Sequence, residues 1–176
     1  MFKDFKPVLV ILIRFLVIYL VMIFLYQLYL NRYQFQLVDP FTGFTANAVH
    51  GVQQLLGYKS VLQDLPGWHS ILFVLNDENT TRIVEGCNAI SVMILFVAFI
   101  LAFYKGLKTF GFIAVSLLFL IAINVLRIAG LNILYLRWPQ YIKIGHDYVF
   151  PAIIYGSIVV LWLVWIKLFV QRDENS

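Results

Sequence analysis

Residues 8–30 read VLVILIRFLVIYLVMIFLYQLYL, and this apolar run decides the class of the protein. A helix of about 23 residues extends about 34 Å, which is enough to cross the roughly 30 Å hydrocarbon core of a bilayer. Arg14 is the charged residue of the run, and its long side chain can reach the nearby headgroups. The run therefore predicts a first transmembrane helix.

The composition of the whole chain agrees with this prediction. Of its 176 residues, 62% are hydrophobic and 12% are charged, whereas soluble proteins carry about 25% charged residues. The net charge is +4, and the basic residues lie in short clusters between apolar runs. Such clusters are typical of residues that orient a protein in a membrane, and they do not indicate nucleic-acid binding. The single cysteine excludes an internal disulfide. The one cysteine and three dispersed histidines lack metal-ligand spacing, so we expect no metal and no cofactor.

Three further apolar runs follow the first one. They predict spans at about residues 88–104, 110–136 and 148–170. We therefore expect a single all-α membrane domain, residues 1–176, with about four spans in the lipid bilayer. Asn124, Arg127 and Gly130 are expected to break or bend the long third span.

The polar region of residues 31–86 is expected to begin with a surface helix. Residues 39–58, DPFTGFTANAVHGVQQLLGY, read as a turn and then a short amphipathic helix. Its apolar residues fall near one face, which suits a helix on a membrane surface. They are Phe44, Val49, Val52, Leu55 and Leu56.

A β-hairpin is expected at the end of this region. The β-branched runs Ile71–Leu75 and Thr80–Val84 flank Asn76-Asp77-Glu78-Asn79. Such runs around a short polar turn are typical of paired strands. The predicted hairpin leads directly into Cys87.

The basic residues predict the orientation in the membrane. They are densest in the short segments 3–14, 105–108 and 167–172, and lysine and arginine collect on the cytoplasmic side. Both termini are therefore expected inside, with residues 31–86 forming an extracytoplasmic loop.

This topology brings three chemically useful side chains to the outer face. Cys87 lies where RIVEGCNAISVMILFVAFILAF, residues 82–103, turns apolar. The start of a helix there would favour the nucleophilic thiolate. Arg127 interrupts an apolar run, a costly placement that usually marks a functional site, and it can stabilise an oxyanion. His146 can exchange a proton near neutral pH. We predict that these three residues are catalytic.

Two polar neighbours are predicted to contact a substrate. Asn124 shares a helical face with Arg127, and Glu85 lies just before Cys87.

Other interpretations of the same residues stay open. A lone cysteine is more often a small buried hydrophobe. Arg127 could pair with Glu85 or Asp147 to hold helices together, and His146 with Asp147 could form an ordinary interfacial pair. His50 or His69 could be the base instead, although both are expected to face solvent.

Three segments of the chain resemble a known family. VEGCNAISVMILF (residues 84–96), NVLRIAGLN (124–132) and GHDYVFPAIIYG (145–156) are similar to signature segments of the exosortase/archaeosortase family. The resemblance covers residues 40–156 and is closest to the short bacterial type called exosortase F. The chain departs from the family in two respects. Many members carry Ser or Ala and then Gly after the cysteine, where this chain has Asn88 and Ala89, and many have about eight spans.

The resemblance implies an activity and a location. Members are membrane cysteine proteases or transpeptidases of the bacterial cytoplasmic (inner) membrane, with the site on its extracytoplasmic side. Their substrates are secreted proteins whose C-terminal sorting signal combines a short motif, a transmembrane helix and a basic tail. The family's Cys, Arg and His would be Cys87, Arg127 and His146. The alternative class is a non-enzymatic membrane assembly factor or small transporter subunit in which Arg127 forms a structural ion pair.

Overall fold

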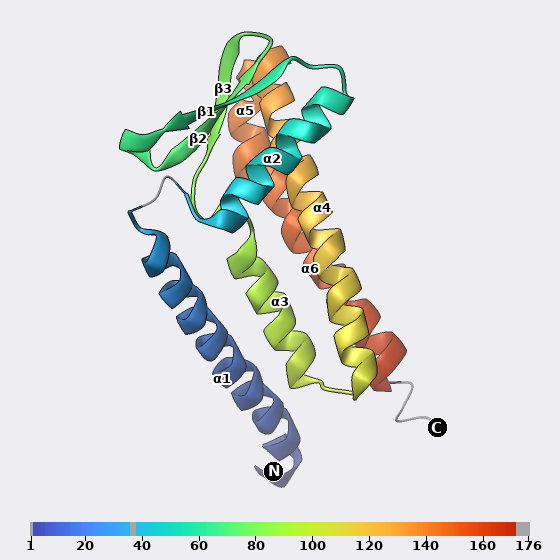
Figure 1. Cartoon of the computed structure of the whole chain (residues 1–176). Helices are drawn as coiled ribbons and strands as arrows, with labels where there is room; N and C mark the ends of the chain where they lie inside the picture. The colour runs from blue at the N-terminus through green and yellow to red at the C-terminus, as the bar shows by residue number, and fades with distance from the viewer. Residues whose placement is uncertain (1, 36–37, 172–176) are drawn as a thin grey trace. The chain divides into compact units, whose positions relative to one another are not determined.

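The computed structural model describes residues 2–35 and 38–171, which are mostly helical with one small sheet (Figure 1). Its elements, in chain order, are α1 (Phe2–Tyr33), α2 (Pro40–Leu55), β1 (Ser60–Leu65), η1 (Pro66–Trp68), β2 (Ser70–Leu75), β3 (Glu78–Ile83), α3 (Ile90–Ala102), α4 (Leu107–Arg137), η2 (Pro139–Tyr141), α5 (Ile142–Ile144), η3 (Gly145–Val149), α6 (Phe150–Trp165) and η4 (Ile166–Val170).

Three helical stretches are long and apolar enough to cross a membrane. They are Val8–Tyr33, Leu107–Arg137 and Pro139–Val170. The last begins earlier than residue 148, where the sequence placed it. Helix α3 is also apolar but has 13 residues, and at 1.5 Å per residue it extends only about 20 Å. The first, third and fourth expected spans therefore each correspond to a long apolar helix. That α3, the second expected span, crosses the membrane stays a prediction.

Helix α4 is a continuous α-helix of 31 residues, so the predicted break at Asn124, Arg127 or Gly130 is wrong. A single glycine costs a helix about 1 kcal/mol, and Asn or Arg costs less. Gly130 serves packing instead, because a β-carbon there would lie 3.4 Å from the Phe150 ring.

The described chain divides into two compact units, and helices α4 and α6 contribute to both. The first unit contains the described residues of Met1–Tyr29, Ile90–Leu120 and Gly156–Ser176. Aromatic rings pack in it: Phe99 stacks on Trp162 at 4.4 Å, and Trp165 stacks on Phe169 at 4.7 Å between ring centroids. The single-domain assignment stays a prediction.

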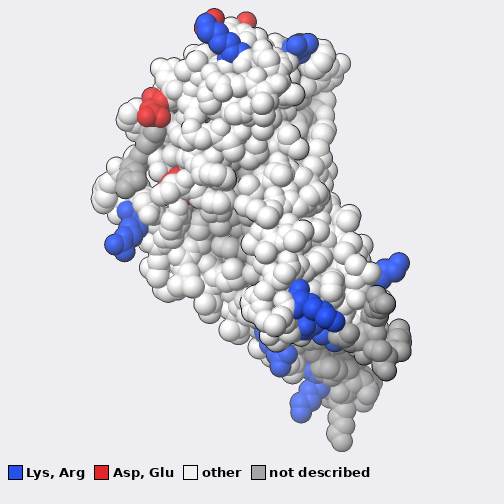
Figure 2. Space-filling view, turned by 45° about the vertical axis from the view of Figure 1, so that its right-hand side comes forward, with Lys and Arg blue, Asp and Glu red and all other residues white. Residues whose placement is uncertain are grey.

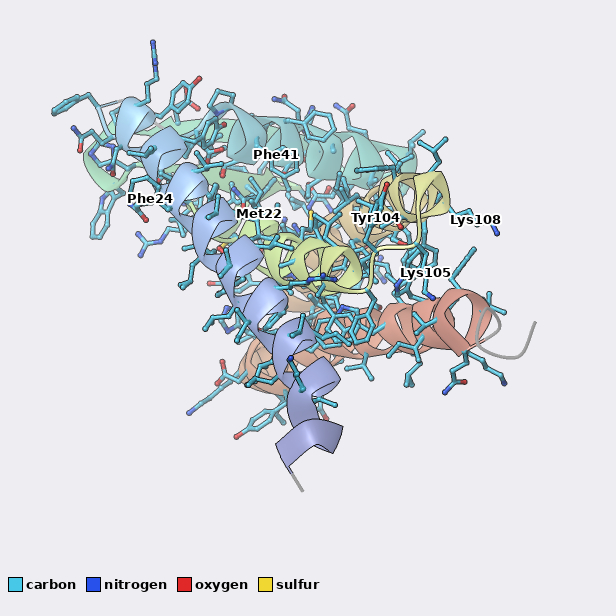
Figure 3. All side chains as sticks on the ribbon, turned by 90° about the horizontal axis from the view of Figure 1, so that it is seen from below. Met22, Phe24, Phe41, Tyr104, Lys105 and Lys108 are labelled. Carbon is cyan, nitrogen blue, oxygen red and sulfur yellow. The ribbon has the colours of Figure 1, made fainter. Side chains whose placement is uncertain are left out.

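Charged side chains are sparse on the protein surface. Lys105 and Lys108 lie at the turn between α3 and α4 (Figure 3). In Figure 2, basic and acidic residues form isolated groups on a surface that is largely uncharged. This is the surface expected of a protein that lies largely in lipid.

The second unit, Leu30–Ala89 and Ile121–Tyr155, has its own hydrophobic core. Helix α2, the sheet and the C-terminal half of α4 all contribute to it. The buried residues of this core are Ala46, Val49, Ile71, Phe73, Leu75, Ile83, Val125, Ile128 and Ala129.

The sheet of this unit is antiparallel in the order β1-β2-β3. Asn76 and Asp77 join β2 to β3 with φ of 51° and 66°, the left-handed geometry of a tight hairpin turn. The predicted hairpin is thus present. The sequence predicted an all-α class with a hairpin of two strands. The structure adds a third strand, because β1 pairs with β2 from Ser60↔Leu75 to Leu65↔Ser70.

Helix α2 is present, and its place on a membrane surface stays a prediction. Its buried side chains are mostly small or polar, whereas Phe44, Leu55 and Leu56 are exposed. Val49 is buried and Val52 packs against the core, so these two apolar side chains face the interior of the second unit.

Candidate active site

Cys87 lies in the turn that joins β3 to α3. Its backbone N–H donates to the Val84 carbonyl at 3.1 Å, and Gly86 before it has φ of 91°. The sequence placed Cys87 at the start of the second span, but α3 begins only at Ile90. The turn, and not the end of a helix, therefore sets the position of the thiol. The side chain is half-buried and packs against the core of the second unit.

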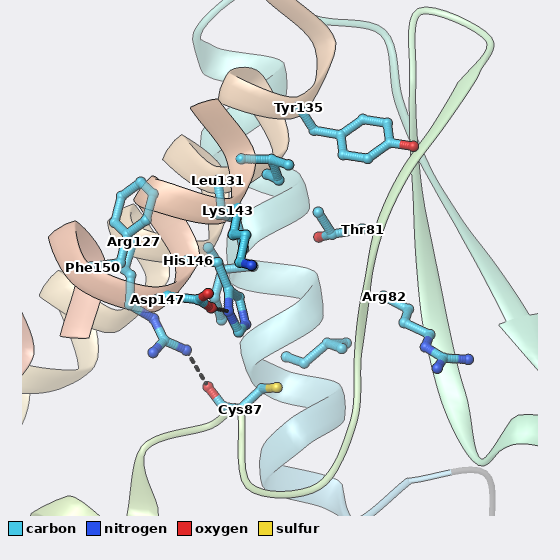
Figure 4. Close-up of a pocket in the computed structure, with 13 residues that line it drawn as sticks. Thr81, Arg82, Cys87, Arg127, Leu131, Tyr135, Lys143, His146, Asp147 and Phe150 are labelled. Carbon is cyan, nitrogen blue, oxygen red and sulfur yellow. Dashed lines mark hydrogen bonds and ion pairs between the residues drawn. The ribbon is translucent and has the colours of Figure 1, made fainter. Parts of the chain in front are cut away.

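Two side chains of α4 hold the backbone carbonyl of Cys87. Asn124 Nδ2 donates to it at 3.1 Å, and Arg127 Nη2 donates to it at 3.2 Å (Figure 4). These donors are three residues apart and lie on one face of the helix. A carbonyl oxygen has two lone pairs, so it can accept both bonds. Asn124, which was predicted to contact a substrate, uses its amide N–H to hold the Cys87 turn.

A cavity of about 400 Å³ opens beside this turn. Cys87, Arg127 and His146 all line it, and they come from the Cys87 turn, α4 and η3 (Figure 4). The structure thus brings the three predicted catalytic residues to one cavity. Its other lining residues are Thr81, Arg82, Ile83, Ile128, Leu131, Tyr135, Ile142, Lys143, Asp147 and Phe150.

His146 is oriented by the residue that follows it. Its Nδ1 lies 2.9 Å from Asp147 Oδ1, and with Nδ1 occupied, Nε2 is the ring nitrogen suited to proton transfer. Within the described part of the chain His146 makes no hydrogen bond to the thiol, and catalytic pairs are often loose before substrate binds. Gly145 permits this arrangement, because a β-carbon there would lie 2.5 Å from Leu134 Cδ2.

Positive charge predominates around the cavity. Arg82, Arg127 and Lys143 line it together with His146, and the carboxylate among its lining residues is that of Asp147. Arg82 lies 4.9 Å from the Trp68 ring centroid in a cation–π contact. A cavity lined by one sign of charge concentrates ligands of the opposite sign.

Arg127 forms no ion pair with Glu85 or Asp147 among the described residues. In residues 2–35 and 38–171, which the structure describes, neither carboxylate forms the structural ion pair with Arg127 that the sequence left open. The sequence did not point to Arg82 of β3 or Lys143 of α5, because an exposed basic residue carries no pattern that marks a site.

The remaining sequence candidates lie away from the cavity. Glu85 is exposed and lines a separate hollow with Trp68 and His69. His69 is exposed as expected, but His50 is half-buried with its Nδ1 2.9 Å from Ser60 Oγ. The expectation that His50 faces solvent is wrong because β1, which carries Ser60, packs beside α2. No group of three or more potential metal ligands occurs among the residues that the structure describes.

Comparison with known families places this geometry in context. The family described as transmembrane exosortase (EpsH) matches residues 5–170. The chain belongs to the transmembrane exosortase family. The family resemblance of the three sequence segments is therefore confirmed, and with its long apolar helices this exosortase is a multi-pass membrane protein. No curated protein and no solved structure matches the chain.

Proposed function

We propose that this exosortase is a membrane-embedded cysteine endopeptidase or transpeptidase that cleaves the C-terminal sorting signal of secreted proteins. One observation carries the proposal: the thiol of the sole cysteine shares a cavity with Arg127 and His146, which come from separate segments of the chain. Nucleophile, oxyanion donor and proton carrier are the groups that acyl transfer requires.

The proposed reaction proceeds through a thioester. His146 accepts the proton of Cys87, and the sulfur attacks the scissile carbonyl. Arg127 keeps Nη2 on the Cys87 carbonyl, while the remaining N–H groups of its fork serve the developing oxyanion. His146 then donates its proton to the leaving amine. Water or an acceptor amine attacks the thioester and loses a proton to His146, and the Cys87 thiolate that leaves takes this proton back from His146.

The length of α4 suggests where the reaction occurs. Thirty-one residues extend about 46 Å, which exceeds the roughly 30 Å hydrocarbon core. If Lys108 lies at the cytoplasmic surface of the membrane, a helix needs about 20 further residues to cross the hydrocarbon core. The helix then reaches the outer surface of the membrane near Ile128. Arg127 then lies near the outer headgroups. A substrate anchored by a C-terminal helix would present its scissile bond at that level, on the extracytoplasmic side of the inner membrane.

The experiment is a comparison of the membrane and secreted proteins of cells that carry wild-type enzyme or Cys87→Ser at equal levels. We expect at least one secreted protein to accumulate with its C-terminal helix attached in the variant, because a serine hydroxyl lacks the accessible ionisation of a thiol. Lys59→Gln is the matched control, since Lys59 is exposed and pairs with Asp77 away from the cavity. Identical protein profiles for wild type and Cys87→Ser would overturn the proposal and favour a non-enzymatic assembly factor.

A further inference from the structure

A buried polar chain connects the nucleophile turn to the start of α2. Asn88, the residue after Cys87, is fully buried and its Nδ2 donates to Thr42 Oγ1 at 2.9 Å. Thr42 Oγ1 in turn donates to Asp39 Oδ2. Thr42 and Asp39 are also fully buried. Segments far apart in sequence are therefore joined by consecutive hydrogen bonds.

The direction of these bonds is fixed by Asp39. Its carboxylate caps α2, where Oδ1 accepts from Phe41 N at 3.0 Å and from Thr42 N at 3.2 Å. The remaining oxygen takes the single hydroxyl hydrogen of Thr42, which leaves an oxygen lone pair of Thr42 for Asn88. A hydroxyl that donates to a carboxylate is a better acceptor, because consecutive hydrogen bonds polarise one another.

The turn needs such external support. Gly86 and Ala89 both have positive φ, of 91° and 60°, and a β-carbon makes that region unfavourable for Ala89. A strained conformation persists only where its surroundings fix it. Asn124 and Arg127 hold the Cys87 carbonyl from α4, and the Asn88 side chain is held from α2.

We infer that Thr42 is a positioning residue of this enzyme: with Asp39 and Asn88 it orients the Cys87 turn so that the thiol faces the cavity. The inference rests on the proposed function for its effect on catalysis. Thr42 is not among the residues that line the cavity, so it acts on the reaction through Asn88 and the turn. Small displacements of a nucleophile by remote changes can cost about 100-fold in rate.

The chain provides a matched pair of substitutions. Thr42→Val removes the hydroxyl and keeps the shape of the side chain. Thr45→Val does the same one turn later, where the hydroxyl of a buried threonine donates to the Phe41 carbonyl of its own helix. Thr42→Ser restores the hydroxyl. Asn88→Ala removes the same hydrogen bond from the donor side and gives an independent reading if Thr42→Val does not accumulate.

The first measurement is hydrogen exchange of the Cys87 amide in the full chain in membranes or detergent, and it needs no substrate. We expect exchange about tenfold faster in Thr42→Val and in Asn88→Ala. Thr45→Val and Thr42→Ser should exchange like wild type. The double variant Thr42→Val with Asn88→Ala should exchange no faster than the faster single variant, because both substitutions break the same Asn88–Thr42 hydrogen bond.

The second measurement is turnover of the precursor that accumulates in the Cys87→Ser strain. We expect Thr42→Val to lower kcat about 10- to 100-fold with little change in KM, and Thr42→Ser to restore it. Equal exchange and equal turnover in Thr42→Val and Thr45→Val would overturn the inference, as would full additivity in the double variant. Processing that survives Cys87→Ser would instead overturn the proposed function, and the exchange data would still decide whether Thr42 holds the turn.

Discussion

The two units of this protein are stabilised by different kinds of contact. In the first unit, aromatic rings pack against one another, as in the group of Phe112, Trp165 and Phe169. In the second unit, buried polar side chains hydrogen-bond between elements, as Asn124 and Asn132 of α4 do. The buried polar residues of the first unit are Thr109 and Ser116, among those that the structure describes.

The difference follows from the surroundings and from the task of each unit. In lipid, an unpaired polar group is costly, so a spanning bundle is best packed with apolar and aromatic side chains. Apolar packing has no strong directional preference and tolerates changes of similar volume. Hydrogen bonds are directional, so they can fix one conformation of a turn that carries a nucleophile. We therefore expect polar substitutions in the second unit to have large effects and comparable changes in the first unit to have small ones.

Arg127→Lys should have the largest effect. Lysine keeps the charge but lacks the planar fork that can bond the Cys87 carbonyl and an oxyanion together. Loss of one oxyanion donor typically lowers the rate about 100- to 1,000-fold. The measurement is precursor cleavage in membranes at matched protein level, with Arg137→Lys, an exposed residue outside the cavity, as the control. Normal cleavage by Arg127→Lys would assign this arginine a structural role.

Asn132→Leu should lower stability more than any polar change in the first unit. Asn132 Oδ1 accepts a hydrogen bond from Thr81 of β3, and removing the acceptor of a buried donor costs about 1–3 kcal/mol. The thermal midpoint in detergent should fall by about 2–4 °C for each kcal/mol. Ser116→Ala, a buried site of the first unit, should cost less than about 0.5 kcal/mol. Equal losses at the two sites would contradict the contrast between the units.

Thiol-labelling rates should reveal the positive charge of the cavity in the second unit. Cys87 is the only cysteine, so labelling of the unmodified chain reports on this site. The quantity to measure is the labelling rate of an anionic methanethiosulfonate divided by that of a cationic one. We expect this ratio to be about tenfold higher for Cys87 than for a small free thiol. Arg82→Gln and Lys143→Gln should each reduce that preference, and Lys59→Gln should not. A preference equal to that of the free thiol would show that the cavity does not attract anions.

Ala89→Gly should have the smallest effect and the opposite sign. Ala89 has φ of 60°, which costs alanine about 1–2 kcal/mol, whereas glycine loses about 0.5–1 kcal/mol of entropy on ordering. We expect a gain of about 0.5 kcal/mol in the free energy of unfolding. Ala98→Gly, inside α3 of the first unit, should lose about 1 kcal/mol. Thermal midpoints of both variants test this, and a loss at residue 89 would argue against a left-handed residue there.

Local sequence information was sufficient for the apolar helices and the hairpin. The runs at residues 8–30 and 110–136 predicted α1 and α4 because helix length and hydrophobicity are properties of a continuous segment. The hairpin around Asn76 and Asp77 was predictable because a tight turn has its own residue preferences. Strand β1 was missed because it has no such turn signal of its own and is defined by its pairing with β2.

The sequence by itself determined the family, the apolar helices and the three residues proposed for catalysis, because each is carried by a short contiguous segment. The tertiary structure alone decided that these residues share a cavity with Arg82 and Lys143, that Asn124 binds the Cys87 carbonyl, and that Thr42 meets Asn88. The two hydrogen bonds join residues that lie 37 and 46 positions apart in the sequence. Their geometry depends on how helices and strands pack, and no local pattern in the chain encodes it.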